Sequence, residues 1–466
     1  MHVYACLLNF GSAKKMEKTV TQHLRLNISN RQILSLALPI SMAILVPQIN
    51  FVTNNIFLGH LDEQSLATAG ITGVYYLIFA VIGNGLNNGL QALIARRAGE
   101  GRIEEIGKLF AQGVRIALAF ALAGILISYL VAPWVFSHFL RSDPLRMQAI
   151  QFVKIRIWGL PFLYIYQLRN ALLVGTNQSR YLVYGTLAEA ATNILLDYSL
   201  IFGHFGFPAL GFDGAAYASI AAEGAGLIVV FGIIKYRGIG KKLRLGKDIR
   251  YNSKLSRLVL VQSAPLIFQF AISIISWEFF YILIEHHGKR DLAISNAMRN
   301  IFGLFGIFTW AFASASNAMV SNIIGQGKKE MVVVLINKIV RLSVSFAVIM
   351  ALLLNFFPQA FLSIYGQDLQ FIEDGIPVIR VVSTALVLMS FATVWLNAVT
   401  GTGNSTANLI IEVITILFYC LYVYLVMEYY NLSILYGWMS EWVYWIITFA
   451  LSYWYIRSGK WKAKVI

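Results

Sequence analysis

The feature that most constrains this chain is a series of apolar runs, each long enough to cross the roughly 30 Å hydrocarbon core of a bilayer. Twelve such runs are found, at residues 33–58, 66–94, 112–137, 149–174, 181–203, 214–235, 258–284, 292–323, 334–363, 373–400, 405–428 and 433–456. In lipid only helices and closed barrels satisfy their own backbone groups, and these runs have helix length. The sequence therefore predicts an all-α polytopic membrane protein with twelve transmembrane helices.

The composition agrees with a membrane protein and argues against a nucleic-acid-binding one. Of the 466 residues 58% are hydrophobic and only 13% are charged, whereas a soluble domain has roughly 25% charged residues. The net charge of +15 lies mainly in the short polar gaps between apolar runs, where membrane topology explains it. We therefore expect membrane lipid, and no nucleic acid, among the partners.

The distribution of Lys and Arg predicts the orientation of the chain. Positive residues gather before the first run, after runs two, six and eight, and after the last run, at Lys14, Lys15, Lys18, Arg25, Arg31, Arg96, Arg97, Arg102, Lys235, Arg237, Lys241, Lys242, Arg244, Lys247, Arg250, Lys328, Lys329, Arg457, Lys460, Lys462 and Lys464. The opposite side holds mainly carboxylates, with Arg141, Arg146, Lys289 and Arg290 as exceptions. Because Lys-rich and Arg-rich loops stay in the cytoplasm, we expect an integral plasma (inner) membrane protein with both termini cytoplasmic.

The first residues of the chain and its two cysteines give little information about fold or function. No convincing cleavable signal peptide precedes the first run, and either Met1 or Met16 could be the start. Neither Cys6 nor Cys420 predicts a disulfide or a metal site. We expect no cofactor.

An internal repeat divides the chain into two halves. Four pairs of similar segments share one constant offset along the chain: "ALPISM" with "SAPLIF" (Pro39, Pro265), "LAT" with "LAI" (Leu66, Leu292), "ALIARRAGEGR" with "AMVSNIIGQGK" (Ala92, Ala318), and "VGTNQS" with "TGTGNS" (Gly175, Gly401). The predicted organisation is a cytoplasmic tail (1–32), an N-lobe of six helices (33–235), a basic cytoplasmic linker (236–257), a C-lobe of six helices (258–456) and a second tail (457–466). Six is even, so both lobes enter the membrane from the same side. Such parallel repeats are common in transporters, although channels and some membrane enzymes also have repeats.

A polar stripe runs along the fifth apolar run. Glu189, Asn193 and Asp197 are four residues apart, which keeps them on one helix face. Asp197 is 17 residues from Arg180 at the cytoplasmic edge, or roughly 25 Å along a helix. A carboxylate in that outer half of the membrane should face a wet cavity or hold a proton or cation. The alternative is that Asp197 is simply solvated at the outer end, and that Asn193 only joins helices by hydrogen bonds.

Other polar residues inside the runs have weaker assignments. Glu189 and Glu223 are candidates for a second proton stop or a counter-charge for a cationic substrate, although Glu189 could also extend to the interface. Runs one and two hold many amides, which either line a hydrated surface or join the two helices. The candidates for substrate binding or proton relay are Gln48, Gln167, Asn170, Glu189, Glu223 and Gln269. Glu278 and Arg299 lie at similar predicted depth, so we expect a structural ion pair between them. The roles of Glu412 and Glu441 stay open.

Several of these segments resemble the multidrug and toxic compound extrusion (MATE) family. The resemblance covers essentially all of the twelve runs. The matching segments are "ALPI" at 37–40, "ALIARRAGEGR" at 92–102, "WGLPFLYIYQLRNALLVGTNQS" at 158–179, "NILLDYSLIFGHFGFPALGFDGAAYAS" at 193–219, "GQGKKE" at 325–330 and "NAVTGTGNST" at 397–406. The resemblance implies two six-helix lobes arranged in a V. It also implies a secondary-active exporter that couples inward flow of Na⁺ or H⁺ to efflux of organic, often cationic, compounds.

The resemblance also implies a cation site in the N-lobe. In one branch of the family this site uses an Asp on span 1, an Asn-x-x-x-Asp on span 5 and a hydroxyl on span 6. Asn193 and Asp197 match the span-5 pair, and Ser219 takes the place of the span-6 hydroxyl. Asn54 stands where the span-1 Asp is expected, so one carboxylate and neutral oxygens remain. That set suits either Na⁺ or protonation of Asp197, and the only metal expected is Na⁺ at Asp197.

The sequence thus predicts an ion-coupled exporter of small organic, cationic compounds, acting as a monomer. An alternative is a lipid-linked oligosaccharide flippase of the same superfamily, which would favour a strongly cationic cleft. A membrane enzyme would need a catalytic constellation, and neither an HExxH nor a P-loop pattern occurs. We therefore expect a transporter and not an enzyme.

Overall fold

The computed structural model of the chain describes residues 22, 24–140, 142–247, 249–365 and 368–464, and these residues form helices and connecting turns without a strand. The helices of the first half are α2 (Asn30–Leu61), α3 (Glu63–Glu100), α4 (Ile103–Phe139), α5 (Asp143–Arg156), α6 (Leu160–Gly175), α7 (Leu182–Phe202), α8 (Phe212–Tyr236) and the short α9 (Ile239–Lys242). Those of the second half are α10 (Ser253–His287), α11 (Lys289–Gly325), α12 (Val332–Phe356), α13 (Pro358–Ser363), α14 (Leu369–Gly401), α15 (Ser405–Val423), α16 (Ile434–Trp438) and α17 (Ser440–Arg457). All twelve predicted runs coincide with helices.

Nine of the described helices are long and apolar enough to cross a membrane by length and composition. The other three runs fall short for local reasons. The fourth run is broken into α5 and α6 by a 3₁₀ turn at Ile157–Gly159, just before Pro161. In α7 the polar stripe lowers the mean hydropathy, and α17 contains many Trp, Tyr and Ser residues. The composition and the helices together make this an integral membrane protein.

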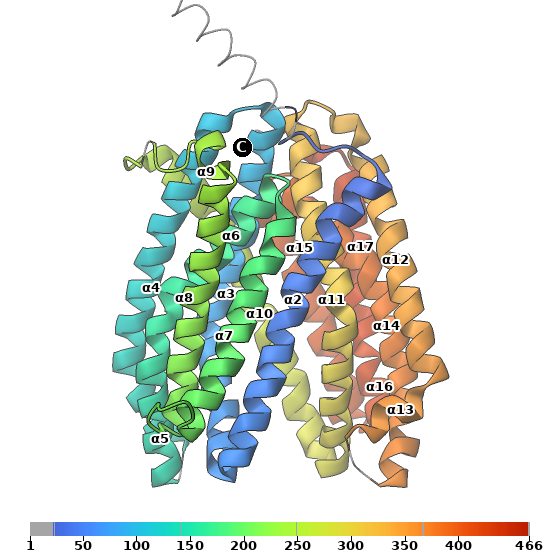
Figure 1. Cartoon of the computed structure of the whole chain (residues 1–466). Helices are drawn as coiled ribbons and strands as arrows, with labels where there is room; N and C mark the ends of the chain where they lie inside the picture. The colour runs from blue at the N-terminus through green and yellow to red at the C-terminus, as the bar shows by residue number, and fades with distance from the viewer. Residues whose placement is uncertain (1–21, 23, 141, 248, 366–367, 465–466) are drawn as a thin grey trace, which may run out of the picture.

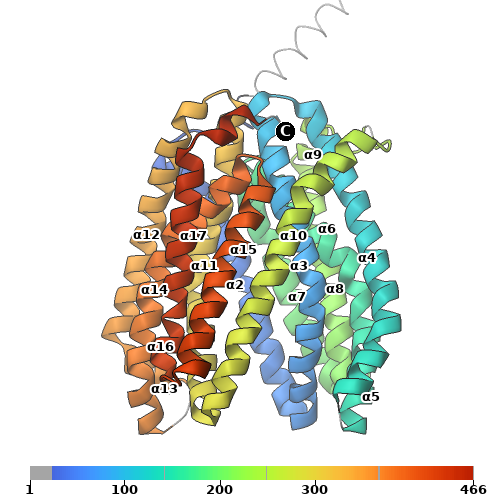
Figure 2. The same ribbon diagram turned by 180° about the vertical axis from the view of Figure 1, so that it is seen from behind.

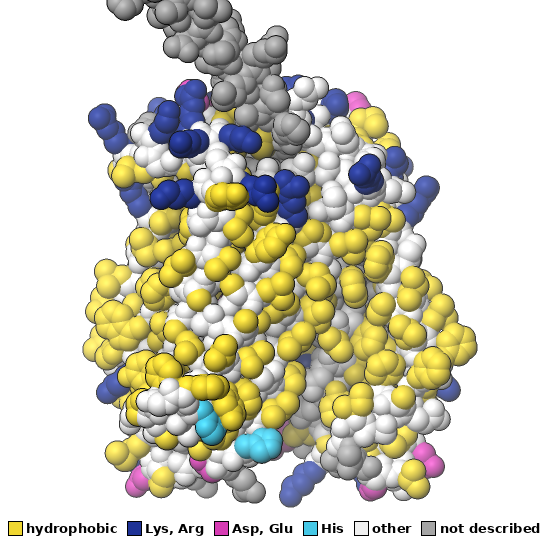
Figure 3. Space-filling model, in the orientation of Figure 1, with side chains coloured by type: hydrophobic (Ala, Val, Ile, Leu, Met, Phe, Trp, Pro, Cys, Tyr) yellow, Lys and Arg dark blue, Asp and Glu magenta, His cyan; other side chains and the backbone are white. Residues whose placement is uncertain are grey.

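The surface shows the expected banding. On the face shown in Figure 3, a broad hydrophobic zone crosses the molecule, Lys and Arg gather at one end of that zone, and Asp and Glu lie mainly at the other. We call these the basic end and the acidic end. The start of α2 and the end of α17 both lie at the basic end (Figures 1 and 2). Two acidic-end carboxylates also cap helices: Asp62 accepts from the Ser65 amide at 2.6 Å, and Asp368 from the Phe371 amide at 2.8 Å.

The repeat is visible in the packing of the helices. In the first half α2 packs against α7 of its own lobe and against α11 of the other lobe. In the second half α10 likewise packs against α15 of its own lobe and α3 of the other. Accordingly α2 crosses the lobe boundary on one side of the molecule and α10 on the opposite side (Figures 1 and 2).

The two lobes are joined through the C-terminal halves of α3 and α11. Arg96 donates to the carbonyl oxygens of Ser321, Gly401 and Thr402 at 3.1, 3.2 and 3.1 Å, and Asn322 Nδ2 donates to Ala95 O at 3.1 Å. The first half of α3 instead has many exposed residues. The described lobes therefore meet at the basic end, and their helices diverge toward the acidic end (Figures 1 and 2).

Two glycines allow the close approach of α3 and α11. A Cβ on Gly99 would lie 2.1 Å from Asn322 O, and one on Gly325 would lie 2.3 Å from Arg96 O. Gly325 is the repeat equivalent of Gly99, and Asn322 is the repeat equivalent of Arg96. The same contact is thus made twice, related by the internal repeat.

Replacing Gly99 by alanine should weaken the junction between the lobes, because a backbone carbonyl cannot move aside as a side chain can. Overpacking of this kind costs about 1–3 kcal/mol, so we expect a lower thermal unfolding midpoint of the detergent-purified protein. Gly73→Ala on the same helix is the control, since nothing lies within 4 Å of its Cβ. Equal midpoints for the two variants would contradict this packing.

Candidate functional site

The candidate site lies where α7 approaches the acidic end. α7 ends at Gly203, whose φ of +77° is readily adopted by a residue without a Cβ. The chain then turns back into α8, and Leu210 N donates to Leu200 O at 2.8 Å. Asp197 is therefore less than two turns from the end of α7, in the half of the helix next to the acidic end.

Asp197 is fully buried and has no hydrogen-bonding partner among the described residues. Its exposure is 0%, and in that part of the chain neither carboxylate oxygen accepts a hydrogen bond or forms an ion pair. Asn193, one turn away on the same face, is 6% exposed, and its Nδ2 is likewise without a described partner. Buried polar atoms are nearly always satisfied, and an isolated buried carboxylate is costly. A proton or a cation on Asp197 would remove that cost.

α2 contributes amide oxygens at the same depth. Phe57 of α2 lies against Tyr198 and Phe202 of α7, with ring centroids 6.3 and 6.1 Å apart. Both helices run from the basic to the acidic end, which places Asn54, one turn before Phe57, level with Asp197. The buried Oδ1 atoms of Asn50 and Asn54 accept no hydrogen bond among the described residues. Gln48, by contrast, is exposed.

The register of α8 against α7 places Ser219 about one helical turn from Asp197, level with Asn193. A Cβ on Gly214 would meet Leu200 O at 2.6 Å, and one on Gly226 would meet Gly185 O at 3.1 Å. Interpolation between these two contacts sets residues 216–217 opposite Asp197, and it sets Ser219, which is half-buried, opposite Asn193. The four residues expected to bind a cation, Asn54, Asn193, Asp197 and Ser219, thus lie within about one helical turn of one another in depth, on three packed helices.

Deeper in the N-lobe, Glu189 lies near a buried arginine. Arg169 has an exposure of 0% and stacks over the Tyr166 ring at 3.6 Å. Its Nη1 has no partner among the described residues, and a Cβ on Gly185, one turn before Glu189, would lie 2.4 Å from it. Glu189 is half-buried and its Oε2 has no partner in the same part of the chain, whereas the Tyr166 hydroxyl bonds Thr186 Oγ1 at 2.9 Å. The sequence alone does not connect Arg169 with the polar stripe.

Glu223 forms an ion pair that the sequence does not predict. Arg156 Nη2 lies 2.5 Å from Glu223 Oε1, and Nη1 lies 3.3 Å from Oε2, so the pair is bidentate. Both side chains are nearly buried, and the guanidinium also lies 4.1 Å from the centre of the Tyr76 ring. Glu223 therefore has a structural partner in this conformation. The 3₁₀ break after α5 turns Arg156 toward α8, which the apolar pattern alone does not indicate.

Gln167 and Asn170 are engaged with neighbouring side chains. Gln167 Nε2 donates to Asn84 Oδ1 at 3.0 Å, which links α6 to the amide-bearing face of α3. Asn170 Oδ1 accepts from Arg169 at 2.8 Å. The first contact favours the interpretation of the amides as links between helices, although the buried Gln167 Oε1 has no partner among the described residues. The second contact lies within α6 and joins no other helix.

In the C-lobe the structure brings Gln269 and Glu412 together. Glu412 has an exposure of 0% and accepts from Ser273 Oγ at 2.6 Å, from Gln269 Nε2 at 3.4 Å and from the Tyr444 hydroxyl. Glu441, 3% exposed, accepts from the indole nitrogens of Trp277 and Trp445 at 3.1 and 2.9 Å. Both carboxyls are surrounded by neutral donors, unlike Asp197.

The expected ion pair between Glu278 and Arg299 is not formed. Both side chains are exposed, and no contact within 4 Å joins them. Arg299 instead lies 5.1 Å from the centre of the Tyr281 ring. Equal depth along two helices does not fix the rotation of each helix about its axis, and here the rotations keep the charges apart.

Known proteins resemble the chain in both sequence and fold. The family model described as MatE matches residues 39–199 and 265–425, two segments whose first residues are repeat equivalents. Similar relatives include a "Probable multidrug resistance protein NorM" from Thermotoga maritima, 25% identical over 94% of each chain. Another protein of that name from a Synechocystis species is 31% identical over 41% of this chain and 42% of its own.

Solved structures extend the likeness to the whole fold. One is described as the outward-facing conformation of a multidrug resistance MATE family transporter of the MOP superfamily; it has a TM-score of 0.86, 17% identity and coverage of 94% of this chain and 98% of its own. A MOP superfamily transporter from Pyrococcus furiosus, whose description mentions a binding pocket of reversed polarity, has a TM-score of 0.85 at 17% identity and the same coverage. At this identity the likeness establishes the fold.

Proposed function

Because the chain belongs to the MatE family, we propose that it is a secondary-active multidrug exporter that couples efflux of small organic compounds to inward movement of Na⁺ or H⁺. Two relatives of the chain are named as probable multidrug resistance proteins, which supports the efflux of several compounds. The basic end is then cytoplasmic, as the excess of Lys and Arg there favours. The membrane is the plasma (inner) membrane, and the protein acts as a monomer.

The observation that carries the proposal is the fully buried carboxylate of Asp197, which has no partner among the described residues. In the coupling cycle Asp197 takes up a proton or Na⁺ from the outer side and releases it on the inner side. Amide and hydroxyl oxygens suit a hard cation, and Asn54, Asn193 and Ser219 offer them within about one helical turn of Asp197. Protonation alone would neutralise the same charge, so the donor set is compatible with either ion.

The junction between the lobes supports alternating access. The lobes are joined by backbone and side-chain contacts at the basic end, while their helices diverge at the acidic end. Rocking about such a junction would expose a site between two parallel repeats to each side in turn. Buried carboxyls in both lobes, at Asp197, Glu412 and Glu441, favour cationic over anionic substrates.

Transport in inverted membrane vesicles tests the proposal. Ethidium accumulation would be followed with a Na⁺ gradient alone, with a proton gradient alone, and with each gradient collapsed by its ionophore. We expect one of the two gradients to drive accumulation above the rate of vesicles lacking the protein. Ethidium accumulation that is the same with and without either gradient would contradict coupled drug export. Transfer of a lipid-linked oligosaccharide without any gradient would contradict it too, and would favour a flippase.

A further inference from the structure

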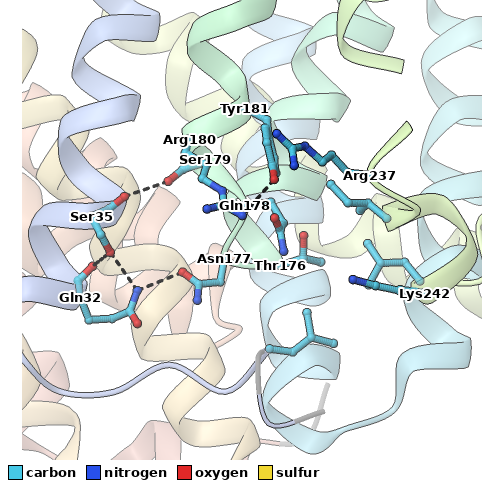
Figure 4. A pocket seen from close by; sticks show the side chains of 13 residues that line it. Gln32, Ser35, Thr176, Asn177, Gln178, Ser179, Arg180, Tyr181, Arg237 and Lys242 are labelled. Atoms are coloured by element: carbon cyan, nitrogen blue, oxygen red, sulfur yellow. Dashed lines mark hydrogen bonds between the residues drawn. The ribbon is translucent and has the colours of Figure 1, made fainter. Parts of the chain in front are cut away.

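A cavity of about 650 Å³ lies at the basic end, away from Asp197. Its walls are the first turns of α2, the loop between α6 and α7, and the turn that joins α8 to α9 (Figure 4). Polar side chains from α2 and the loop line one side, and three cations, Arg180, Arg237 and Lys242, line the rest. No carboxylate is among the described residues that line it.

The wall formed by α2 and the loop is held by hydrogen bonds. Gln32 Nε2 donates to Asn177 Oδ1 at 3.0 Å, and Ser179 Oγ donates to Ser35 O at 3.3 Å. Asn177 has a φ of +62°, a left-handed conformation that asparagine tolerates better than most residues. The polar wall is therefore held in place by hydrogen bonds between α2 and the loop.

The three cations that line this space lack a neutralising partner in the described part of the chain. Arg180, Arg237 and Lys242 make no ion pair there, whereas Arg102 and Arg244 at the same end bond Glu105 and Glu104. Arg180 donates to the Tyr181 hydroxyl at 2.9 Å. Arg237 extends from the opposite wall toward Tyr181, and Lys242 extends from it toward Thr176 (Figure 4). Three positive charges converging on one polar cavity favour an anion.

The position of the cavity suits the headgroup level of a membrane. Its lining includes the first turns of α2 and residues of α9, and both of these elements lie at the basic end (Figure 1). Leu24, Ile239 and Leu243 add apolar lining, and Tyr236, next to Arg237, is 86% exposed. Tyrosines are enriched at this level of membrane proteins, and basic pockets on the cytoplasmic side commonly bind lipid phosphates.

We propose that this cavity binds the phosphate group of an anionic ligand, with Arg180, Arg237 and Lys242 as its charged contacts. The ligand is either an anionic lipid of the inner leaflet or a free phosphate compound, and both present the same oxygens. Binding is independent of the ion coupling proposed above. A bound ligand would also contact the segment before α2, because Leu24 lines the cavity. That segment is joined to the C-lobe, since the Leu24 carbonyl oxygen accepts a hydrogen bond from Asn322 Nδ2 at 3.0 Å.

The test measures lipid binding to the full chain by native mass spectrometry in a nonionic detergent. Phosphatidylglycerol is titrated first, then phosphatidylcholine with the same acyl chains, and then glycerol 3-phosphate and inorganic phosphate as competitors. We expect one saturable phosphatidylglycerol site. The triple variant Arg180→Gln, Arg237→Gln, Lys242→Gln should weaken it about a hundred-fold, since each cation near a phosphate typically contributes about five-fold.

A matched control removes three other exposed cations at the basic end: Lys254→Gln, Arg257→Gln and Lys328→Gln. This control should bind phosphatidylglycerol as the wild type does, as should the charge-preserving variant Arg180→Lys, Arg237→Lys, Lys242→Arg. Thermal melts confirm that each variant is folded. Displacement by free phosphate would assign the site to a soluble ligand. Equal binding of the two lipids, or equal losses in the triple variant and its control, would overturn the proposal.

Discussion

Asp197→Asn is expected to reduce ion-driven efflux roughly 100-fold, toward the upper end of typical coupling between two sites. Asparagine keeps the shape of the side chain but cannot exchange a proton and carries no charge to attract Na⁺. The measurement is gradient-driven ethidium accumulation in inverted vesicles that contain equal amounts of wild-type and variant protein. Asp143→Asn is the control, because that carboxylate is 73% exposed at the acidic end; it should transport normally.

The same substitution should not destabilise the protein. Asp197 has no donor or cation to lose among the described residues, so a neutral amide at this buried position leaves the thermal unfolding midpoint unchanged or raises it. Residues that serve function at a cost in stability commonly behave in this way. A variant that both unfolds earlier and loses transport would indicate a structural role for Asp197 instead.

Arg156→Gln should destabilise the protein more than either Gly99→Ala or Asp197→Asn. Removing one partner of a buried ion pair leaves an uncompensated charge and costs about 3–5 kcal/mol, and in this variant Glu223 would be that charge. The expected result is a clear drop in the unfolding midpoint in detergent and a lower yield of folded protein. Glu223→Gln should behave similarly, because it leaves the buried guanidinium of Arg156 without its charged partner.

The double variant Arg156→Met, Glu223→Leu distinguishes a loss of pairing from a loss of packing. Removing both charges removes both desolvation costs, so stability should return close to that of the wild type. Midpoints of the two single variants and the double variant form a thermodynamic cycle. If their effects simply add, the two side chains do not interact, and the bidentate contact is not energetically significant.

The sequence predicts the helices and the repeat well because both depend on local patterns. Apolar runs of bilayer length mark every transmembrane helix, and the offset that relates the two halves reappears in the reciprocal contacts of Gly99 with Asn322 and of Gly325 with Arg96. Asp197 can be singled out for a similar reason, since a four-residue spacing places it with Asn193 on one face of an otherwise apolar helix.

The sequence does not predict which side chains from distant segments contact one another. The pair Arg156–Glu223 joins residues 67 positions apart and depends on a break in the fourth run. The pair Glu278–Arg299 is expected from depth alone, but the rotation of each helix about its axis separates the two charges. Gln269 and Glu412 show the opposite case, in which two unconnected candidates meet in one hydrogen-bonded cluster. Helix rotation is set by packing across the whole lobe and not by any local pattern.

The most direct measurement is the release of the coupling ion from the purified full-length protein when a transported compound binds. A weakly buffered detergent solution would be followed with a proton-sensitive dye, and with a Na⁺ electrode in a parallel experiment. The wild type should release one proton or one Na⁺ for each molecule of compound bound, and Asp197→Asn should bind the compound without releasing either. Equal release from the wild type and the variant would contradict the assignment of Asp197 as the group that exchanges the ion.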